Sequence, residues 1–189
     1  WSWSRGLGDV YKRQYVCYYD TKFLNIMIGK YLKKKYKFIP DHFKPNLPKS
    51  IELGDVAGIS IDQQDNIYLF NRSKHPVIVL SQTGEFLRTW GQGVFKNPHG
   101  SHIGFDNNIY LTDNGDHTVR KFTLHGKLLL QIGIPDSSSG FMSGKPFCKC
   151  THSALSTEGI LIVSDGYGNA SIHIFDAIGK HLKSWGIPG

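Results

Sequence analysis

Cysteine is scarce in this chain of 189 residues, and its three cysteines exclude several kinds of small protein. Cys148 and Cys150 are separated by one residue, and Cys17 lies far from both. This spacing supports neither a zinc ribbon nor a thioredoxin-like pair, and three cysteines are too few for a disulfide scaffold. The cysteines therefore leave the redox compartment open.

Long apolar runs are also lacking. The apolar stretch at residues 23–28 is far shorter than the roughly 20 residues that cross a bilayer. Lysines follow this stretch, whereas a signal peptide carries its basic residues first. We expect no membrane span here. We predict that residues 15–49 are either a partly disordered leader or a stretch wrongly assigned to the protein.

Basic residues are not in excess in the main part of the chain, although the net charge is +7. Residues 1–49 hold eleven Lys or Arg against three Asp, whereas residues 50–189 hold eleven against twelve acidic residues. Binding to phosphate backbones needs a basic stripe, so we expect no nucleic-acid partner.

Residues 4–14 (SRGLGDVYKRQ) look like the in-frame translation of a transposon-type sequencing adapter. A scar of that kind must be left out of fold reasoning, so we interpret residues 1–14 as non-native. The same eleven codons in an uninterrupted genomic locus would contradict this interpretation.

What the sequence does contain is a repeat. Two apolar strands and a Gly-turned hairpin that ends in Trp-Gly or Ile-Gly occur three times. The hairpin glycines are Gly84, Gly126 and Gly179, so the repeat steps by 42 and then by 53 residues. This period is typical of a β-propeller blade of four antiparallel strands. A Pro-, Gly- and Ser-rich insertion at residues 135–147 accounts for the longer second step.

We therefore predict an all-β fold, a β-propeller domain at residues 50–189 with blades at about 55–91, 98–133 and 149–186. Propellers typically need four to eight blades to close a ring, so three blades predict a fragment. We expect such a fragment to be inactive alone and prone to associate through exposed strands such as residues 160–163.

Two sets of loops meet at one mouth of a propeller channel: those before each innermost strand and those after each second strand. His99 is predicted to precede an innermost strand, and Arg72 and Tyr167 to follow second strands. We expect these three side chains at one mouth, as a metal ligand, an anion clamp and a phenol.

At these residues the chain resembles the NHL-repeat propellers, and among them the bacterial-type branch of the peptidyl-α-hydroxyglycine α-amidating lyase (peptidylamidoglycolate lyase) family. Six motifs coincide in order: Val56-Ala57-Gly58, Phe70-Asn71-Arg72, Pro98-His99-Gly100, Thr112-Asp113 with His117, Phe147-Cys148, and Ser164 to Asn169. The resemblance implies a six-bladed ring that cleaves the C–N bond of a peptidyl-α-hydroxyglycine, or of a related small α-hydroxy amide, to give an amide and glyoxylate. We slightly favour a secreted or periplasmic location over a cytoplasmic one.

The resemblance also implies which residues act. His99 matches one of three histidines that hold zinc, Tyr167 matches the tyrosine that acts as base, and Arg72 matches the arginine that steadies the substrate carboxylate. A structural calcium ion takes backbone carbonyls at positions matching Ile59 and Ser101. The other ligands would lie in blades beyond Gly189.

This set of groups suits the reaction, which removes a proton from an α-hydroxyl and expels an amide nitrogen. A Lewis acid on the hydroxyl oxygen lowers its pKa while a phenolate accepts the proton. The planar fork of an arginine fits a carboxylate in a way that lysine does not.

The chain departs from the family pattern at two places. Animal members pair the cysteine matching Cys148 with one that falls at Gly168 here, so the resemblance implies a free Cys148. Their Pro-Thr-Asp becomes Cys150-Thr151-His152, which changes the innermost strand of the third blade.

Simpler interpretations stay open at this point. His99 could be a structural turn histidine, Tyr167 could only pack over the mouth, and Arg72 could form a salt bridge with Asp113 or Asp116. A non-catalytic propeller that serves as a ligand-binding or protein-interaction platform is the alternative function, since the fold hosts many functions. We expect a structural role for His117, and surface or turn positions for six further histidines: His75, His102, His125, His152, His173 and His181.

Overall fold

Three four-stranded antiparallel sheets make up the part of the chain that the computed structural model describes, residues 44–186. In each sheet the strands are hydrogen-bonded in sequence order, as in the blades of a β-propeller. The predicted fold class is therefore confirmed. The predicted adapter segment, and all of the predicted leader except residues 44–49, lie outside the described residues.

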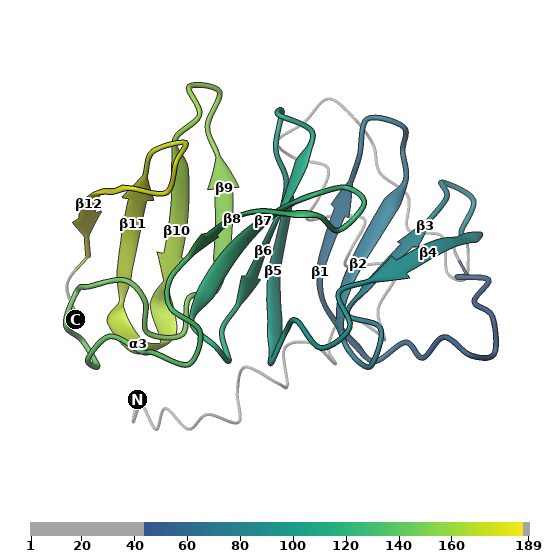
Figure 1. Cartoon of the computed structure of the whole chain (residues 1–189), viewed down its shortest axis with the longest axis horizontal. Coiled ribbons are helices and arrows are strands. Elements are labelled where there is room, and N and C mark those ends of the chain that lie inside the picture. The colour runs from purple at the N-terminus through teal and green to yellow at the C-terminus, as the bar shows by residue number, and fades with distance from the viewer. Residues whose placement is uncertain (1–43, 187–189) are drawn as a thin grey trace, which may run out of the picture. The chain divides into compact units, whose positions relative to one another are not determined.

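Each sheet is called a blade below, and Figure 1 labels its strands. Blade 1 consists of β1 (Asp55–Ile61), β2 (Ile67–Arg72), β3 (Val77–Leu80) and β4 (Phe86–Trp90). Blade 2 consists of β5 (Pro98–Ile103), β6 (Asn108–Asp113), β7 (Thr118–Thr123) and β8 (Leu128–Ile132). Blade 3 consists of β9 (His152–Leu155), β10 (Leu161–Asp165), β11 (Ser171–Phe175) and β12 (His181–Trp185), with the short helix α3 (Gly166–Asn169) after β10.

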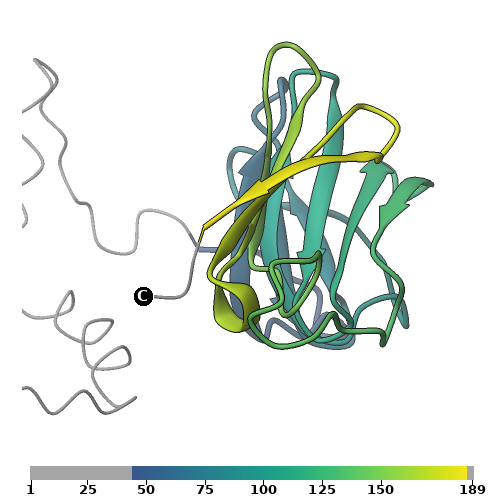
Figure 2. The same ribbon diagram turned by 90° about the vertical axis from the view of Figure 1, so that its left-hand side faces the viewer.

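The blades stack face to face. Seen from the end at which blade 3 lies, the other sheets follow behind it (Figure 2). The first strands of the three blades, β1, β5 and β9, are neighbours in space (Figure 1). A hydrogen bond of 2.6 Å between the hydroxyls of Ser60 and Ser101 links the first two of them.

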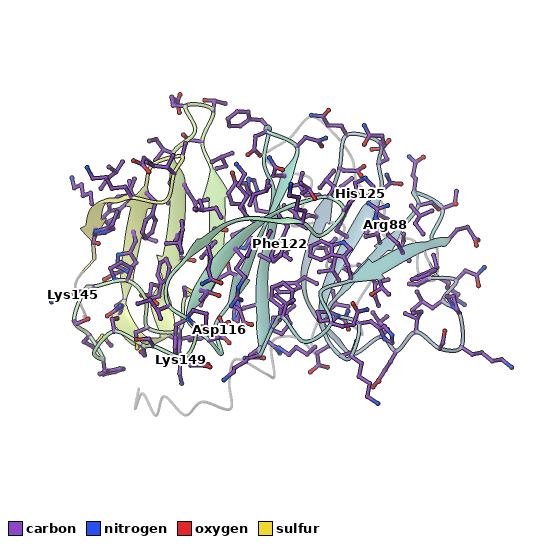
Figure 3. The ribbon with its side chains drawn as sticks, in the orientation of Figure 1. Arg88, Asp116, Phe122, His125, Lys145 and Lys149 are labelled. Carbon is purple, nitrogen blue, oxygen red and sulfur yellow. The ribbon has the colours of Figure 1, made fainter. Side chains whose placement is uncertain are left out.

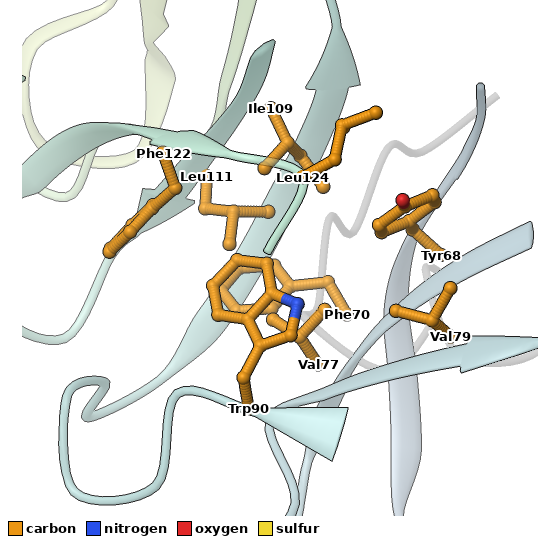
Figure 4. Packing of buried hydrophobic residues seen from close by; sticks show 9 residues of the cluster. All are labelled: Tyr68, Phe70, Val77, Val79, Trp90, Ile109, Leu111, Phe122 and Leu124. Atoms are coloured by element: carbon orange, nitrogen blue, oxygen red, sulfur yellow. The ribbon is translucent and has the colours of Figure 1, made fainter. Parts of the chain in front are cut away.

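A hydrophobic core fills the space between each pair of blades. Between blades 1 and 2 it consists of nine buried residues: Tyr68, Phe70, Val77, Val79, Trp90, Ile109, Leu111, Phe122 and Leu124 (Figure 4). Between blades 2 and 3 a second core includes Val119, Ile132, Phe147 and Phe175. Each such side chain contributes about 1.5–3 kcal/mol to stability when it leaves water. All four residues of β3 are buried, since this strand packs on both faces.

The structure explains why Gly recurs in the last hairpin of each blade and why an apolar residue ends the last strand. Gly126 turns the third hairpin connection of blade 2 with a φ of +87°, and a Cβ placed on it would lie 2.9 Å from the Trp90 ring that ends blade 1. Gly179 of blade 3 sits in the same way on Leu130 and Ile132, at the end of blade 2. The hairpin glycine of one blade therefore covers the terminal apolar residue of the blade before it.

The other face of blade 1 is covered from within the chain. Leu47 and Ile51 pack on a small cluster that contains Leu69, Ile78 and Leu80. Asn46 holds this segment in place, because its backbone N–H donates to the Gly84 carbonyl at 2.8 Å.

Several details differ from the sequence-based expectations. The third blade begins at His152 rather than at residue 149, and within residues 160–163 Leu161 and Val163 are buried against blade 2. His173 is wholly buried on β11, and His102 is a half-buried residue of β5, so their predicted surface or turn positions are wrong. Within residues 44–186 no helix is long and apolar enough to cross a membrane.

Candidate functional site

His99 lies in a β-bulge at the start of β5, not in the loop before the strand as predicted. Pro98 pairs with Asp113 and Gly100 pairs with Thr112, so His99 is the extra residue between two ladder pairs. A bulge rotates the local backbone and changes the direction of a side chain. The bulge therefore directs the imidazole away from the regular face of the sheet.

Two hydrogen bonds fix the His99 ring. Its Nδ1 lies 2.8 Å from the carbonyl oxygen of Thr151, and its Nε2 lies 3.3 Å from the hydroxyl oxygen of Tyr167. The two rings meet edge to face, with centroids 5.5 Å apart. Blades 2 and 3 thus bring together two of the residues singled out in the sequence.

Tyr167 stands on helix α3, directly after the strand β10. Its side chain is 61% exposed, so the ring faces solvent except where it meets His99. The short helix ends at Ala170, which takes the left-handed conformation with a φ of 50°. This sharp end returns the chain into β11.

Arg72 is the last residue of β2 and is exposed. Its Nε donates a hydrogen bond of 3.1 Å to the carbonyl oxygen of Pro98, the residue before His99. Among residues 44–186 no carboxylate lies within ion-pair distance of this guanidinium, since Asp116 pairs with Arg120 and Asp113 accepts backbone N–H groups. The salt-bridge interpretation of Arg72 is therefore wrong.

Two further histidines follow, His152 beside His99 and His102 beside His152, and the sequence predicted both at surface or turn positions. Burial and the nearby His99 lower the pKa of His152, and burial and the nearby His152 lower the pKa of His102. A Cβ on Gly100 would lie 2.7 Å from His152 Nδ1, so this imidazole packs directly on the β5 backbone. His152 belongs to Cys150-Thr151-His152, where the sequence departs from the pattern of the proteins that it resembles.

The hydrogen bonds of His99 suit a zinc ligand. Histidines that bind zinc commonly donate their other ring N–H to a backbone carbonyl, which fixes the tautomer. With Nδ1 bonded to Thr151, the lone pair of Nε2 is left on the side of Tyr167. Within the described chain no group of three or more His, Cys, Asp and Glu side chains is arranged to hold a metal ion.

The predicted calcium positions lie on neighbouring strands. Ile59 of β1 pairs with Leu69 of β2, and Ser101 of β5 pairs with Leu111 of β6. The strands β1 and β5 are adjacent, and the two residues hold equivalent positions in their blades. Calcium binding there stays a prediction.

A cavity in the described part of the chain lies away from these residues. A space of about 330 Å³ opens between blades 1 and 2, where Arg88, His125 and Asp62 are among the lining residues. Figure 3 shows Arg88 and His125 at the end of the strands away from Lys149 and α3. None of His99, Tyr167 and Arg72 lines this space, so it lies apart from the candidate site.

No family model matches the chain. Among curated proteins, the peptidyl-α-hydroxyglycine α-amidating lyase 2 of Drosophila melanogaster is 30% identical over 160 residues, which are 69% of this chain and 38% of that protein. The corresponding lyase 1 of the same fly is 28% identical over 165 residues, 72% of this chain and 30% of that protein. The chain resembles the amidating lyases.

The chain also resembles human NHL repeat-containing protein 3, with 22% identity over 142 residues, or 70% of this chain and 41% of that one. Among solved structures, a streptogramin B lyase superposes with a TM-score of 0.55 at 17% identity, covering 78% of this chain and 44% of that one, and so supports the fold alone. The two fly relatives are lyases, and the chain is an NHL-repeat, lyase-like propeller. It spans less than half the length of these relatives.

Proposed function

We propose that these blades carry part of a lyase site that splits a peptidyl-α-hydroxyglycine, or a small α-hydroxy amide, into an amide and glyoxylate. The observation that supports this most is the His99–Tyr167 contact across two blades, with Arg72 beside it. A Lewis-acid ligand, a proton acceptor and a carboxylate clamp are the three groups that this reaction needs.

The residues can act as follows. Tyr167, as phenolate, takes the proton from the α-hydroxyl, the C–N bond breaks, and the proton returns to the amide nitrogen that leaves. Arg72 binds the carboxylate that becomes part of glyoxylate, through its planar N–H fork. His99 Nε2 would hold a zinc ion, which when bound lowers the pKa of an oxygen attached to it.

The exposure of Tyr167 fits this role, because a general base must reach the substrate. The ring touches His99 at its edge and leaves most of its surface free.

The test replaces Tyr167 in the parent protein that contains these blades within a complete ring. Tyr167→Phe keeps the ring and removes the proton acceptor, so glyoxylate release from α-hydroxyhippurate should fall about a hundredfold or more. Zinc content and melting temperature should stay close to those of the wild-type protein. Tyr110→Phe, which removes a phenol at the other end of blade 2, is the control.

Unchanged turnover in Tyr167→Phe would remove Tyr167 from the reaction. A wild-type protein with full zinc and no glyoxylate release would overturn the lyase and favour the interaction platform.

A further inference from the structure

The position of Tyr167 is decided by the backbone of α3, since its own ring makes few contacts. A helix of four residues has little stability of its own. Something else must hold it if the phenol is to stay within 3.3 Å of His99.

The insertion at residues 135–147 folds against this helix. The backbone N–H of Met142 donates to the carbonyl oxygen of Gly168 at 2.7 Å, directly after Tyr167. The backbone N–H of Gly144 donates to Asn169 Oδ1 at 3.2 Å. In the sequence this insertion only explained a longer repeat, whereas in the structure it contacts the end of α3.

Asn169 is the centre of these contacts and is 1% exposed. Its Nδ2 donates to the Lys145 carbonyl at 2.6 Å and to Asp165 Oδ2 at 2.7 Å, and lies 3.2 Å from Ser139 Oγ. Both the oxygen and the nitrogen of its side-chain amide are therefore hydrogen-bonded.

Asp165 closes the other end of the helix and is wholly buried. Its carboxylate accepts the backbone N–H of Cys148 at 2.8 Å and faces His173 Nε2 at 3.2 Å. A buried carboxylate with this many donors is costly to disturb, because any donor removed leaves charge uncompensated.

Gly168 permits the closest approach in this arrangement. A Cβ at this position would collide with Cys148 Sγ and with the Cys148 carbonyl oxygen. The absence of a side chain lets the Cys148 segment lie directly under the helix that carries Tyr167.

We propose that residues 139–148, together with Asp165 and Asn169, form a brace that positions Tyr167 against His99. The role as positioning residues for catalysis rests on the proposed function, whereas the mechanical role of the brace does not. Asn169 and Asp165 touch no substrate; they act through the backbone of α3.

The test uses the full chain with Cys17→Ser, so that Cys148 and Cys150 are the thiols left. Cys148 is 8% exposed beneath Gly168 and Cys150 is wholly buried, so attack by a thiol reagent on Cys148 reports opening of the brace. Asn169→Ala should speed labelling of Cys148 about tenfold, the scale of one or two lost hydrogen bonds. Amide exchange at residues 166–169 should rise with it.

Asn108→Ala is the matched control, because the Asn108 amide bonds only to Asp106 in a turn of blade 2. It should leave both readouts as in the wild-type chain. If Asn169→Ala does not fold, Ser139→Ala serves instead, since it removes a hydroxyl that donates to the Lys145 carbonyl and accepts from the Asn169 amide at the exposed side of the brace.

Labelling and exchange at the wild-type rates in a folded Asn169→Ala or Ser139→Ala chain would overturn the brace. In the parent protein, Asn169→Ala should lower kcat while KM stays near the wild-type value, because Arg72 is untouched. If the wild-type parent releases no glyoxylate, the lyase proposal fails, and the thiol and exchange measurements still decide the brace.

Discussion

At the scale of single residues, the backbone rather than side-chain packing directs His99. The bulge at Pro98 and Gly100 turns its ring out of the sheet, and the Thr151 carbonyl fixes the nitrogen that faces away from Tyr167. The Nε2 atom, which meets only the Tyr167 hydroxyl, then has its direction set before any metal arrives. Such preorganisation lowers the cost of binding.

The first prediction concerns this nitrogen. The parent protein should bind about one zinc ion per chain at a catalytic site with three histidines and an open position. His99→Ala removes one ligand, so zinc content after dialysis, measured by elemental analysis, should fall well below one. His125→Ala, an exposed histidine at the other end of blade 2, should leave it unchanged. Equal zinc in wild-type and His99→Ala protein would exclude His99 from the ligand set.

The second prediction concerns two phenols that occupy equivalent places. The hydroxyls of Tyr68 and Tyr110 donate to Asp62 and Asp106, and burial raises the pKa of each tyrosine to about 12. A phenol that stays protonated in the folded chain stabilises it fully below about pH 10, and this stability is lost as the pH rises from 10 through 12. The loss should reach about 2–3 kcal/mol per tyrosine.

Tyr68→Phe tests this linkage. It should cost about 1 kcal/mol near neutral pH through the lost hydrogen bond. Between pH 10 and 12, the unfolding free energy from urea titrations should fall less steeply than in the wild-type chain. A slope equal to that of the wild type would show that Tyr68 does not carry the alkaline loss.

At this scale the sequence predicts only the end of the blades at which each residue lies. Antiparallel parity predicts which loops share a mouth, and the structure brings Tyr167 and His99 into contact there. The bulge was not predictable, because one extra residue in a ladder leaves no mark in the apolar pattern. His173 was misjudged, since its buried partner Asp165 lies on a neighbouring strand and the pairing depends on register.

At the scale of elements, the hairpin glycine and the terminal Trp act as a pair across blades. The sequence gives both residues and their period, but not their contact, because the two belong to different repeats. Gly126 has a left-handed φ and touches the Trp90 ring. Gly93 has a φ of +72° and no atom within 4 Å of its would-be Cβ.

These two glycines allow the cost of a left-handed backbone to be separated from the cost of a clash with the Trp90 ring. Gly93→Ala should cost about 1 kcal/mol of unfolding free energy, the penalty of a left-handed backbone alone. Gly126→Ala should cost about 1–3 kcal/mol more, because Trp90 must also move. Denaturant titration of both variants measures the difference. Equal losses would show that the Trp90 ring yields freely and that the contact is not a constraint.

The insertion at residues 135–147 makes contacts that its sequence does not predict. Its Pro, Gly and Ser content predicts a loop, which is what the structure contains. Its hydrogen bonds to Asn169 and Gly168 join residues that are about 25 positions apart in the sequence. The composition of the insertion therefore gives no sign of them.

At the scale of the whole described part, the two outer faces differ. The outer face of blade 1 is covered by Leu47 and Ile51, and the residues beneath them are buried. On blade 3, Ile162 pairs with Ile174 and Ile172 pairs with Trp185, so these four side chains share one face. Trp90 and Ile132, at the equivalent positions of blades 1 and 2, lie under the next blade, whereas Trp185 is 47% exposed.

The last prediction follows from this exposed face. An apolar sheet face of this kind favours association, since water leaves both surfaces when two such faces meet. The chain should therefore sediment as a dimer or larger species at about 50 µM, a concentration at which exposed apolar surface drives association. Replacing Ile174 by Lys puts a charge in the middle of the face and should shift the chain toward monomer. Leu87→Lys, at an exposed apolar residue of β4 outside this face, should not. A wild-type chain that stays monomeric and melts cooperatively would show that the blade 3 face is stable in water, and that the contacts within the three blades suffice.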